Sequence, residues 1–194
     1  AERKKQAKLM CKEIKTALSD LSFMQVDFDM VFDRLSECTA NGIDDCYFVI
    51  STNVGEKLRP LYDVASGGEL SRIMLAVKSC MAAEDNIGTL VFDEIDVGIS
   101  GRAAQAVAEK MALISRKHQV ISITHLPQIA AMADSHYLIE KSADEGKTVT
   151  KIVRLSEAES ITEIARLLGG ASITDAVMSN ALEMKQMAEK TKKY

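Results

Sequence analysis

The sequence predicts a mixed α/β fold with a parallel-sheet core, an antiparallel strand pair and a helical arm at the N-terminus. Short apolar runs at Thr89 to Phe92 and Val120 to Ile123 alternate with helical stripes, which is typical of parallel α/β cores. Two earlier runs, Val26 to Phe32 and Cys46 to Ile50, flank the turn signal Asn41–Gly42 and predict an antiparallel pair.

The overall composition indicates a globular domain and argues against a DNA-binding or membrane-spanning one. The chain has 194 residues, of which 47% are hydrophobic and 27% charged, the balance of an ordinary globular domain. Its net charge of −4 argues against a domain whose own task is to grip DNA. No uncharged apolar run reaches the length of a membrane span, so we expect no membrane partner. Because the first residue is Ala1 and not Met, we expect a piece of a longer protein.

The first 24 residues carry an apolar repeat of three and four residues. This spacing is the seam of a coiled coil, and it indicates the end of a coiled-coil arm. The repeat lasts under three heptads, so the pattern suits an ordinary amphipathic helix equally well. Its members are Ala7, Met10, Ile14, Ala17, Leu21 and Met24.

The rest of the chain predicts alternating helices and strands. Leu70, Ile73, Met74, Val77 and Met81 form one helical face. Further elements are expected as helices at 104–114 and 128–133, strands at 136–140 and 149–155 joined by a tight turn at 144–146, and helices at 157–168 and 173 to about 190.

The segment Ser66–Gly67–Gly68–Glu69 predicts a helix start with two possible uses. Ser66 and Glu69 have the spacing of a capping box, which is a purely structural device. A cap needs no glycine pair, however. Two glycines leave the backbone N–H groups at the helix N-terminus uncovered by side chains. The helix dipole favours an anion there, so the segment also indicates a phosphate site.

The acidic pair Asp93–Glu94 follows a predicted buried strand. Ligands bind at the carboxyl ends of strands in parallel α/β sheets. Asp93 suits a Mg²⁺ ligand, and Glu94 suits a base that orients and deprotonates water. The competing interpretation is two solvated acids at a strand end.

A histidine follows the next predicted strand along the chain. His125 leaves the end of Ile121–Ser122–Ile123, where an imidazole can reach a bound ligand. A histidine at a strand end also commonly packs or caps, and the residue alone leaves both uses open.

Taken together, these motifs resemble the ABC ATPase family in order and spacing: signature motif, Walker B strand, D-loop and switch histidine. Within that family, the amino-acid sequences of these motifs are similar to those of the RecN proteins of the SMC-like branch. The likeness covers most of the chain after about Phe23. The matching stretches are Ser66–Arg72, Phe92–Gly101, Ile123–Gln128, Val49–Leu61 and Glu163–Gly170.

The resemblance implies the C-terminal lobe of an ABC-type P-loop ATPase head, with ATP and Mg²⁺ as cofactors. Residues 1–24 would end the coiled-coil arm, and 25–194 would form the lobe. Glu94 and His125 would be catalytic, and Asp93 would hold the metal. The γ-phosphate bound by a second head would be held by Ser66, Gly67, Gly68 and Glu69, with Ser100 in the D-loop.

Two positions depart from the wider ABC pattern. Glu69 stands where transporters usually carry Gln, and the D-loop ends in Ser100–Gly101 instead of the common aspartate. The second departure leaves the D-loop's contact with the opposite head open.

The sequence contains no Walker A motif. Its nearest match is Gly146–Lys147–Thr148, where Lys141 replaces the first glycine and the segment lies between two predicted strands. The resemblance therefore implies three partners: a Walker A lobe of the same protein, a second head, and DNA reached through the intact protein. It implies DNA double-strand-break repair in the cytoplasm, at the nucleoid. The rival interpretations are a transporter nucleotide-binding domain and a non-catalytic dimerisation lobe.

Overall fold

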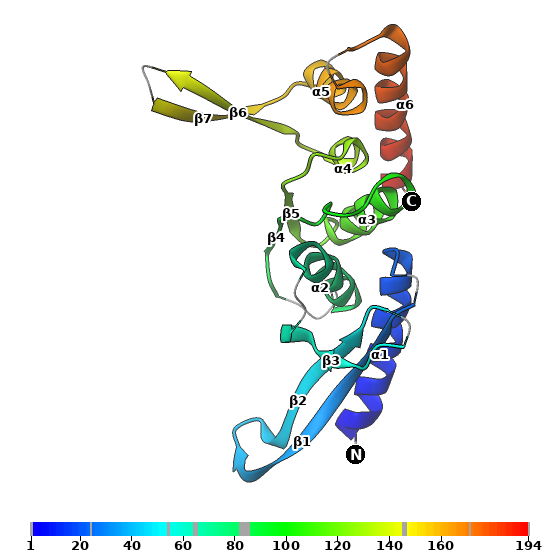
Figure 1. Cartoon of the computed structure of the whole chain (residues 1–194), viewed down its shortest axis with the longest axis vertical. Coiled ribbons are helices and arrows are strands. Elements are labelled where there is room, and N and C mark those ends of the chain that lie inside the picture. Colours follow the sequence, from blue (N-terminus) through cyan, green and yellow to red (C-terminus); the bar gives the residue numbers. More distant parts are fainter. Residues whose placement is uncertain are drawn as a thin grey trace. The chain divides into compact units, whose positions relative to one another are not determined.

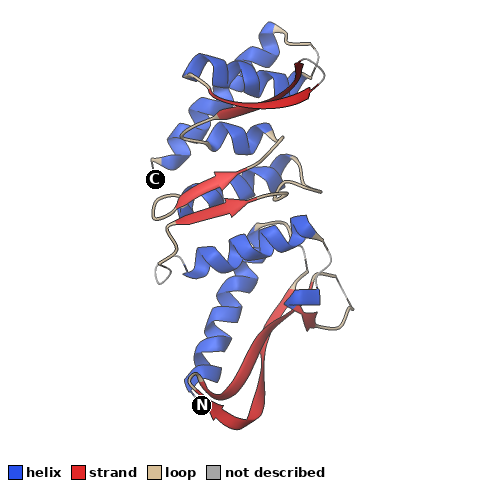
Figure 2. Ribbon diagram, turned by 90° about the vertical axis from the view of Figure 1, so that its left-hand side faces the viewer, coloured by secondary structure: helices blue, strands red, loops and turns tan. Residues whose placement is uncertain are grey.

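The chain folds into two compact units. A computed structural model describes residues 2–23, 25–53, 55–63, 66–81, 86–144, 147–170 and 172–193. The first unit comprises Ala1–Gly98 with Ile114–Ser122, and the second comprises Ile99–Leu113 with Ile123–Tyr194. Helices and strands alternate along the chain (Figure 2), so the predicted mixed α/β fold is confirmed.

The first unit opens with helix α1 (Glu2–Asp20). Figure 1 shows α1 lying along the first strand hairpin, and it also packs on α2. Its buried side chains are Ala7, Cys11, Ile14, Ala17 and Leu18. Most of the predicted repeat is therefore buried inside the first unit, together with Cys11 and Leu18, which the repeat does not include. The predicted boundary at Met24 lies outside the described residues.

An antiparallel sheet follows, in the order β1 (Asp27–Thr39), β2 (Gly42–Ser51) and β3 (Arg59–Pro60). The predicted pair is confirmed and is longer than predicted. The turn at Asn41–Gly42 is also confirmed, and Gly42 has a φ of 102°, which favours glycine. Phe28 and Phe48 stack with their ring centroids 5.1 Å apart, and the 3-10 turn η1 (Leu61–Asp63) ends this region.

A parallel strand pair completes the first unit. Strand β4 (Thr89–Phe92) pairs with β5 (Gln119–Ser122), as predicted. His118 helps to fix the start of the pair, because its Nδ1 lies 2.6 Å from the carbonyl oxygen of Ile87. One face of β4 buries Leu90 and Phe92, whereas Val91 on the other face is 64% exposed.

Helix α2 (Gly67–Met81) packs on a different face from the predicted one. Ile73 and Val77 are buried as predicted, but Leu70, Met74 and Met81 are more than a third exposed. The buried face instead contains Gly68, Arg72, Leu75 and Ala76. The prediction was wrong there because it counted apolar residues only, and the packed face includes a glycine and an arginine.

The second unit begins with α3 (Gly101–Ile114), of which only the last residue belongs to the first unit. It continues with α4 (Pro127–Met132), hairpin β6–β7 (Tyr137–Asp144 and Lys147–Arg154), α5 (Glu157–Gly169) and α6 (Asp175–Lys192). Helices α4, α5 and α6 pack together around small and branched side chains: Ile129, Ala130, Ile164, Ala165, Ala181 and Ala188. The hairpin is confirmed, although Glu145 and Gly146 of its predicted turn lie outside the described residues. Across the described part of the chain, every helix is too short or too polar to cross a bilayer.

Candidate functional site

The described bonds show Ser66 capping the N-terminus of α2, which is the Ser66 half of the predicted capping box. The hydroxyl of Ser66 accepts a hydrogen bond from the backbone N–H of Glu69 at 3.4 Å, and its carbonyl accepts one from Leu70 at 2.9 Å. Helix α5 offers a comparison within the same chain. There Ser156 and Glu159 form a complete capping box without a glycine pair. Capping therefore accounts for Ser66 and leaves Gly67 and Gly68 to be explained.

The glycine pair brings α2 against the segment that follows β4. A Cβ on Gly68 would lie 3.0 Å from both the carbonyl oxygen of Glu94 and Cβ of Val97, and 3.1 Å from the Val97 carbonyl oxygen. A Cβ on Gly67 would collide with the carboxylate of Glu94. Gly68 thus allows a close approach of the turn that a side chain would crowd, and Gly67 leaves room for the Glu94 carboxylate. The carboxylate of Glu94 lies at the helix N-terminus, where the dipole favours negative charge.

The acidic pair lies in a tight turn. Glu94 has a φ of 57°, a left-handed conformation that costs a non-glycine residue about 1–3 kcal/mol. Its own N–H donates to Oδ1 of Asp93 at 2.9 Å, and its carbonyl accepts from Val97 N at 3.1 Å. Asp93 and Glu94 are exposed, whereas the next residues, Ile95 and Asp96, are buried. The turn is therefore anchored by its second half and presents both carboxylates to solvent.

Two residues of α2 that the sequence analysis did not single out hold this turn. The hydroxyl of Ser71 donates to the carbonyl of Asp93 at 2.8 Å. Arg72, only 8% exposed, donates from Nη1 to the carbonyls of Val97 at 2.8 Å and Ile95 at 3.4 Å. Burial lowers the pKa of the Arg72 guanidinium, and the Glu69 carboxylate opposes that shift. One feature of the sequence could have identified Arg72 as a packed residue: its spacing of four from Gly68 and from Ala76 places the three on one face of the helix.

The remaining predicted residues belong to the second unit. His125 is exposed and follows β5 by three residues, and its neighbour Thr124 accepts from Leu126 N through its hydroxyl at 3.0 Å. Ser100 precedes α3, and its carbonyl accepts from Ala103 N at 3.2 Å. The described contacts therefore connect the glycine pair to the acidic turn, and both of these lie in the first unit. The roles of His125 and Ser100 stay predictions.

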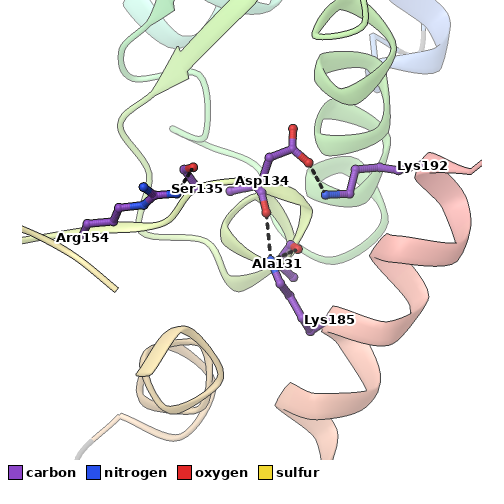
Figure 3. A network of polar contacts seen from close by, with 7 residues as sticks. Ala131, Asp134, Ser135, Arg154, Lys185 and Lys192 are labelled. Atoms are coloured by element: carbon purple, nitrogen blue, oxygen red, sulfur yellow. Dashed lines mark hydrogen bonds and ion pairs between the residues drawn. The ribbon is translucent and has the colours of Figure 1, made fainter. Parts of the chain in front are cut away.

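A second polar cluster lies in the second unit, around a cavity of about 640 Å³ beside α6. Figure 3 shows Lys185 and Lys192 of α6 reaching the end of α4. Lys185 donates to the carbonyls of Ala131 and Ala133 at 3.3 and 2.8 Å, and Lys192 pairs with Asp134 at 2.6 Å. These contacts satisfy the carbonyls at a helix C-terminus. The cluster thus ties α4 to α6.

Solved structures with a similar arrangement define the class. An SMC head domain with its coiled coil and joint, from Pyrococcus yayanosii, has a TM-score of 0.59 at 22% identity and covers 84% of this chain and 29% of that one. A structure described under ATP-driven dimerisation and DNA-stimulated activation of SMC ATPases has a TM-score of 0.51 at 20% identity, covering 87% and 96%. The chain has a fold that is found within SMC-type ATPase heads.

Sequence relatives identify the branch. The DNA repair protein RecN of Bacillus subtilis is 42% identical over 98% of this chain, and that of Halalkalibacterium halodurans is 41% identical over 98%. The chain belongs to the RecN family. It spans about a third of the length of these relatives, 36% and 34% respectively. No protein-family model matches the chain.

Proposed function

We propose that the chain supplies the Walker B and signature half of an SMC-like ATPase head, which hydrolyses ATP at a composite dimer site during DNA double-strand-break repair. One observation carries the proposal: the glycine-pair helix start is packed directly on the turn that presents Asp93 and Glu94. A helix N-terminus suits phosphate binding, and a carboxylate pair suits Mg²⁺ binding and water activation. In the proposal the carboxylates act on nucleotide held by the Walker A lobe of the same protein, and the helix N-terminus acts on nucleotide of the second head.

Asp93 and Glu94 divide the chemistry in this proposal. Mg²⁺ is usually held by one or two carboxylates together with substrate phosphates. An exposed carboxylate at a strand end fits that donor set, and it is Asp93 that we propose as the ligand. Bound Mg²⁺ would neutralise charge on the transferring phosphoryl group. Glu94 orients the attacking water and accepts its proton, and His125 donates a hydrogen bond to the γ-phosphate.

The helix start of α2 acts on nucleotide held by a second copy of the head. Ser66, Gly67, Gly68 and Glu69 contribute the N-terminal turn of the helix, whose backbone N–H groups attract the γ-phosphate. Ser100 of the D-loop contacts the opposite head. The composite arrangement makes hydrolysis depend on dimerisation, because each site takes groups from both heads.

The Walker A lobe is the first partner, and an exposed sheet face supports it. Parallel sheets are normally covered on both faces. In the first unit, Val91 of β4 is 64% exposed and Ile121 of β5 is 45% exposed. Because the chain spans about a third of its relatives' length, we propose that the Walker A lobe of the longer protein covers this face. DNA is reached through the intact protein, as the relatives' name, DNA repair protein RecN, suggests. We place this activity in the cytoplasm, at the nucleoid.

Replacing the base tests the proposal. In the intact protein, Glu94→Gln should still bind ATP but lose turnover, because an amide keeps the shape and cannot accept the proton. ATP should then trap the dimer, which size-exclusion chromatography with and without ATP would detect. Glu183→Gln, an exposed position on α6, is the matched control and should leave turnover unchanged. Near-normal turnover in Glu94→Gln would remove Glu94 from the role of base.

A further inference from the structure

Arg72 occupies an unusual position for a cation. It is 8% exposed, and its guanidinium carbon lies 5.6 Å from the centroid of the Phe23 ring. A cation over an aromatic face is attracted by the ring quadrupole, more strongly when both are desolvated. Burying a charge is costly unless it is hydrogen-bonded. Arg72 thus lies between Phe23 on one side and the acidic turn on the other.

On the turn side, the hydrogen bonds described for Arg72 go to backbone carbonyls. Its two acceptors are the carbonyls of Ile95 and Val97, 3.4 and 2.8 Å from Nη1. These residues follow directly on Asp93 and Glu94. With the 2.8 Å bond from Ser71 to the Asp93 carbonyl, α2 grips the turn before and after Glu94. A residue in the left-handed region persists only when its surroundings over-determine it, and these bonds do so for Glu94.

On the other side, Phe23 belongs to the connection between α1 and β1. Its side chain is 7% exposed, and the residue is tied to the helix end by a bond from its N–H to the Leu18 carbonyl at 3.2 Å. Helix α1 itself packs on α2. A displacement of the end of α1 would therefore move the ring that lies against Arg72.

We propose that Arg72 is a positioning residue that ties the end of α1, through Phe23, to the turn carrying Asp93 and Glu94. The consequence for turnover rests on the proposed roles of those two carboxylates. The mechanical link does not, because it concerns only contacts within the first unit. If α1 is the end of an arm, Arg72 makes the geometry of the base sensitive to where that arm lies.

The first test measures the link without nucleotide. In the 194-residue chain, Arg72→Met keeps the length of the side chain and removes both bonds to the turn. Hydrogen exchange followed by NMR should show the N–H of Val97 exchanging about tenfold faster or more, while amides in the middle of α2 keep their rates. Arg72→Lys should fall between, since one ammonium lacks the planar fork. Arg166→Met removes an exposed arginine of α5 and should change nothing at Val97.

The role of the Phe23 ring is tested in the same way. Phe23→Leu should also speed exchange at Val97, although less than Arg72→Met does. Phe28→Leu is the matched control, because it removes another buried ring of the first unit, one that stacks on Phe48 instead. If Phe28→Leu had the same effect as Phe23→Leu, loosening of the core would explain both, and the proposed link through Phe23 would be wrong.

The second test separates positioning from folding in the intact protein. Arg72→Met should lower kcat for ATP hydrolysis by about 10- to 100-fold and leave KM within about threefold, because misplaced catalytic groups cost rate more than binding. Arg72→Lys should recover part of kcat. Unchanged kcat together with unchanged exchange at Val97 would overturn the proposal. Normal turnover in Glu94→Gln would instead refute the proposed function, and the exchange rates would still decide the role of Arg72.

Discussion

Gly67 and Gly68 are adjacent, yet substituting them should have different consequences. Gly68→Ala should lower the free energy of unfolding, whereas Gly67→Ala should lower ATP turnover and leave stability unchanged. In Gly68→Ala, the new methyl group meets two backbone carbonyl oxygens and a Cβ at 3.0–3.1 Å, none of which can move alone. Overpacking of this kind costs about 1–3 kcal/mol. Taking the middle of that range, about 2 kcal/mol, and subtracting the up to about 1 kcal/mol of helix propensity that alanine recovers leaves a net loss of roughly 1–2 kcal/mol.

In Gly67→Ala, the methyl group meets only the end of the Glu94 side chain. That side chain can rotate away, so the free energy of unfolding should stay within about 0.5 kcal/mol of the original value. The carboxylate of Glu94 must move, however. We therefore expect the intact protein with Gly67→Ala to keep its stability and lose most of its turnover.

Thermal unfolding of the 194-residue chain checks the stability part. A loss of roughly 1–2 kcal/mol corresponds to a Tm about 2–8 °C lower in a protein of this size. Gly88→Ala is the control, because a Cβ there meets nothing within 4 Å. If Gly68→Ala unfolds at the same temperature as Gly88→Ala, the close approach of α2 to the acidic turn is not as described.

Three further predictions concern other parts of the chain. His125→Ala in the intact protein should slow hydrolysis and spare ATP binding, and an unchanged turnover rate would return His125 to a packing role. Ser156→Ala should cost about 1 kcal/mol of stability as a lost cap, measured as a lower Tm, without changing turnover. Burial lowers the pKa of His136, with Lys185 adding to the shift and Glu163 opposing it. The folded state therefore disfavours the charged form, and stability present above the unfolded pKa of about 6.5 should fall as pH drops below it. Urea unfolding at pH 7.5 and 5.5 should show a smaller difference for His136→Gln than for the original chain.

Much of the fold was predictable because each element has a local signature. The parallel pair β4–β5 follows from two apolar runs, and the hairpin β1–β2 from alternation and Asn41–Gly42. The buried face of α2 was not predictable from the sequence, because tertiary contacts determine which of its side chains are buried. Arg72 is buried by partners 23 and 25 residues away along the chain, and no local pattern indicates them.

The candidate site was predictable in its residues but not in its assembly. The motifs indicated Ser66, Gly67, Gly68, Asp93 and Glu94 separately. Their spacing gave no reason to expect that the glycines would pack against Glu94 of the same chain, because that contact depends on where α2 crosses the end of β4. The left-handed backbone of Glu94 was equally invisible, since glutamate is not a residue that favours it.

The composite site is the central claim, and Ser66→Arg tests it most directly. If Ser66 only caps α2, the change should cost about 1 kcal/mol and leave an active ATPase. If the helix start reaches the γ-phosphate of a second head, ATP-dependent dimerisation and turnover should both be lost, while each head still binds ATP through its own Walker A.

The decisive measurement is complementation between two inactive proteins. Heads with Ser66→Arg are mixed with heads carrying a disabled Walker A motif, and ATP turnover is measured as a function of the mixing ratio. The account predicts that activity returns, with a maximum near equal amounts, because one of the two sites in the mixed dimer is again intact. A Ser66→Arg protein that dimerises normally with ATP and turns it over unaided would contradict the composite site.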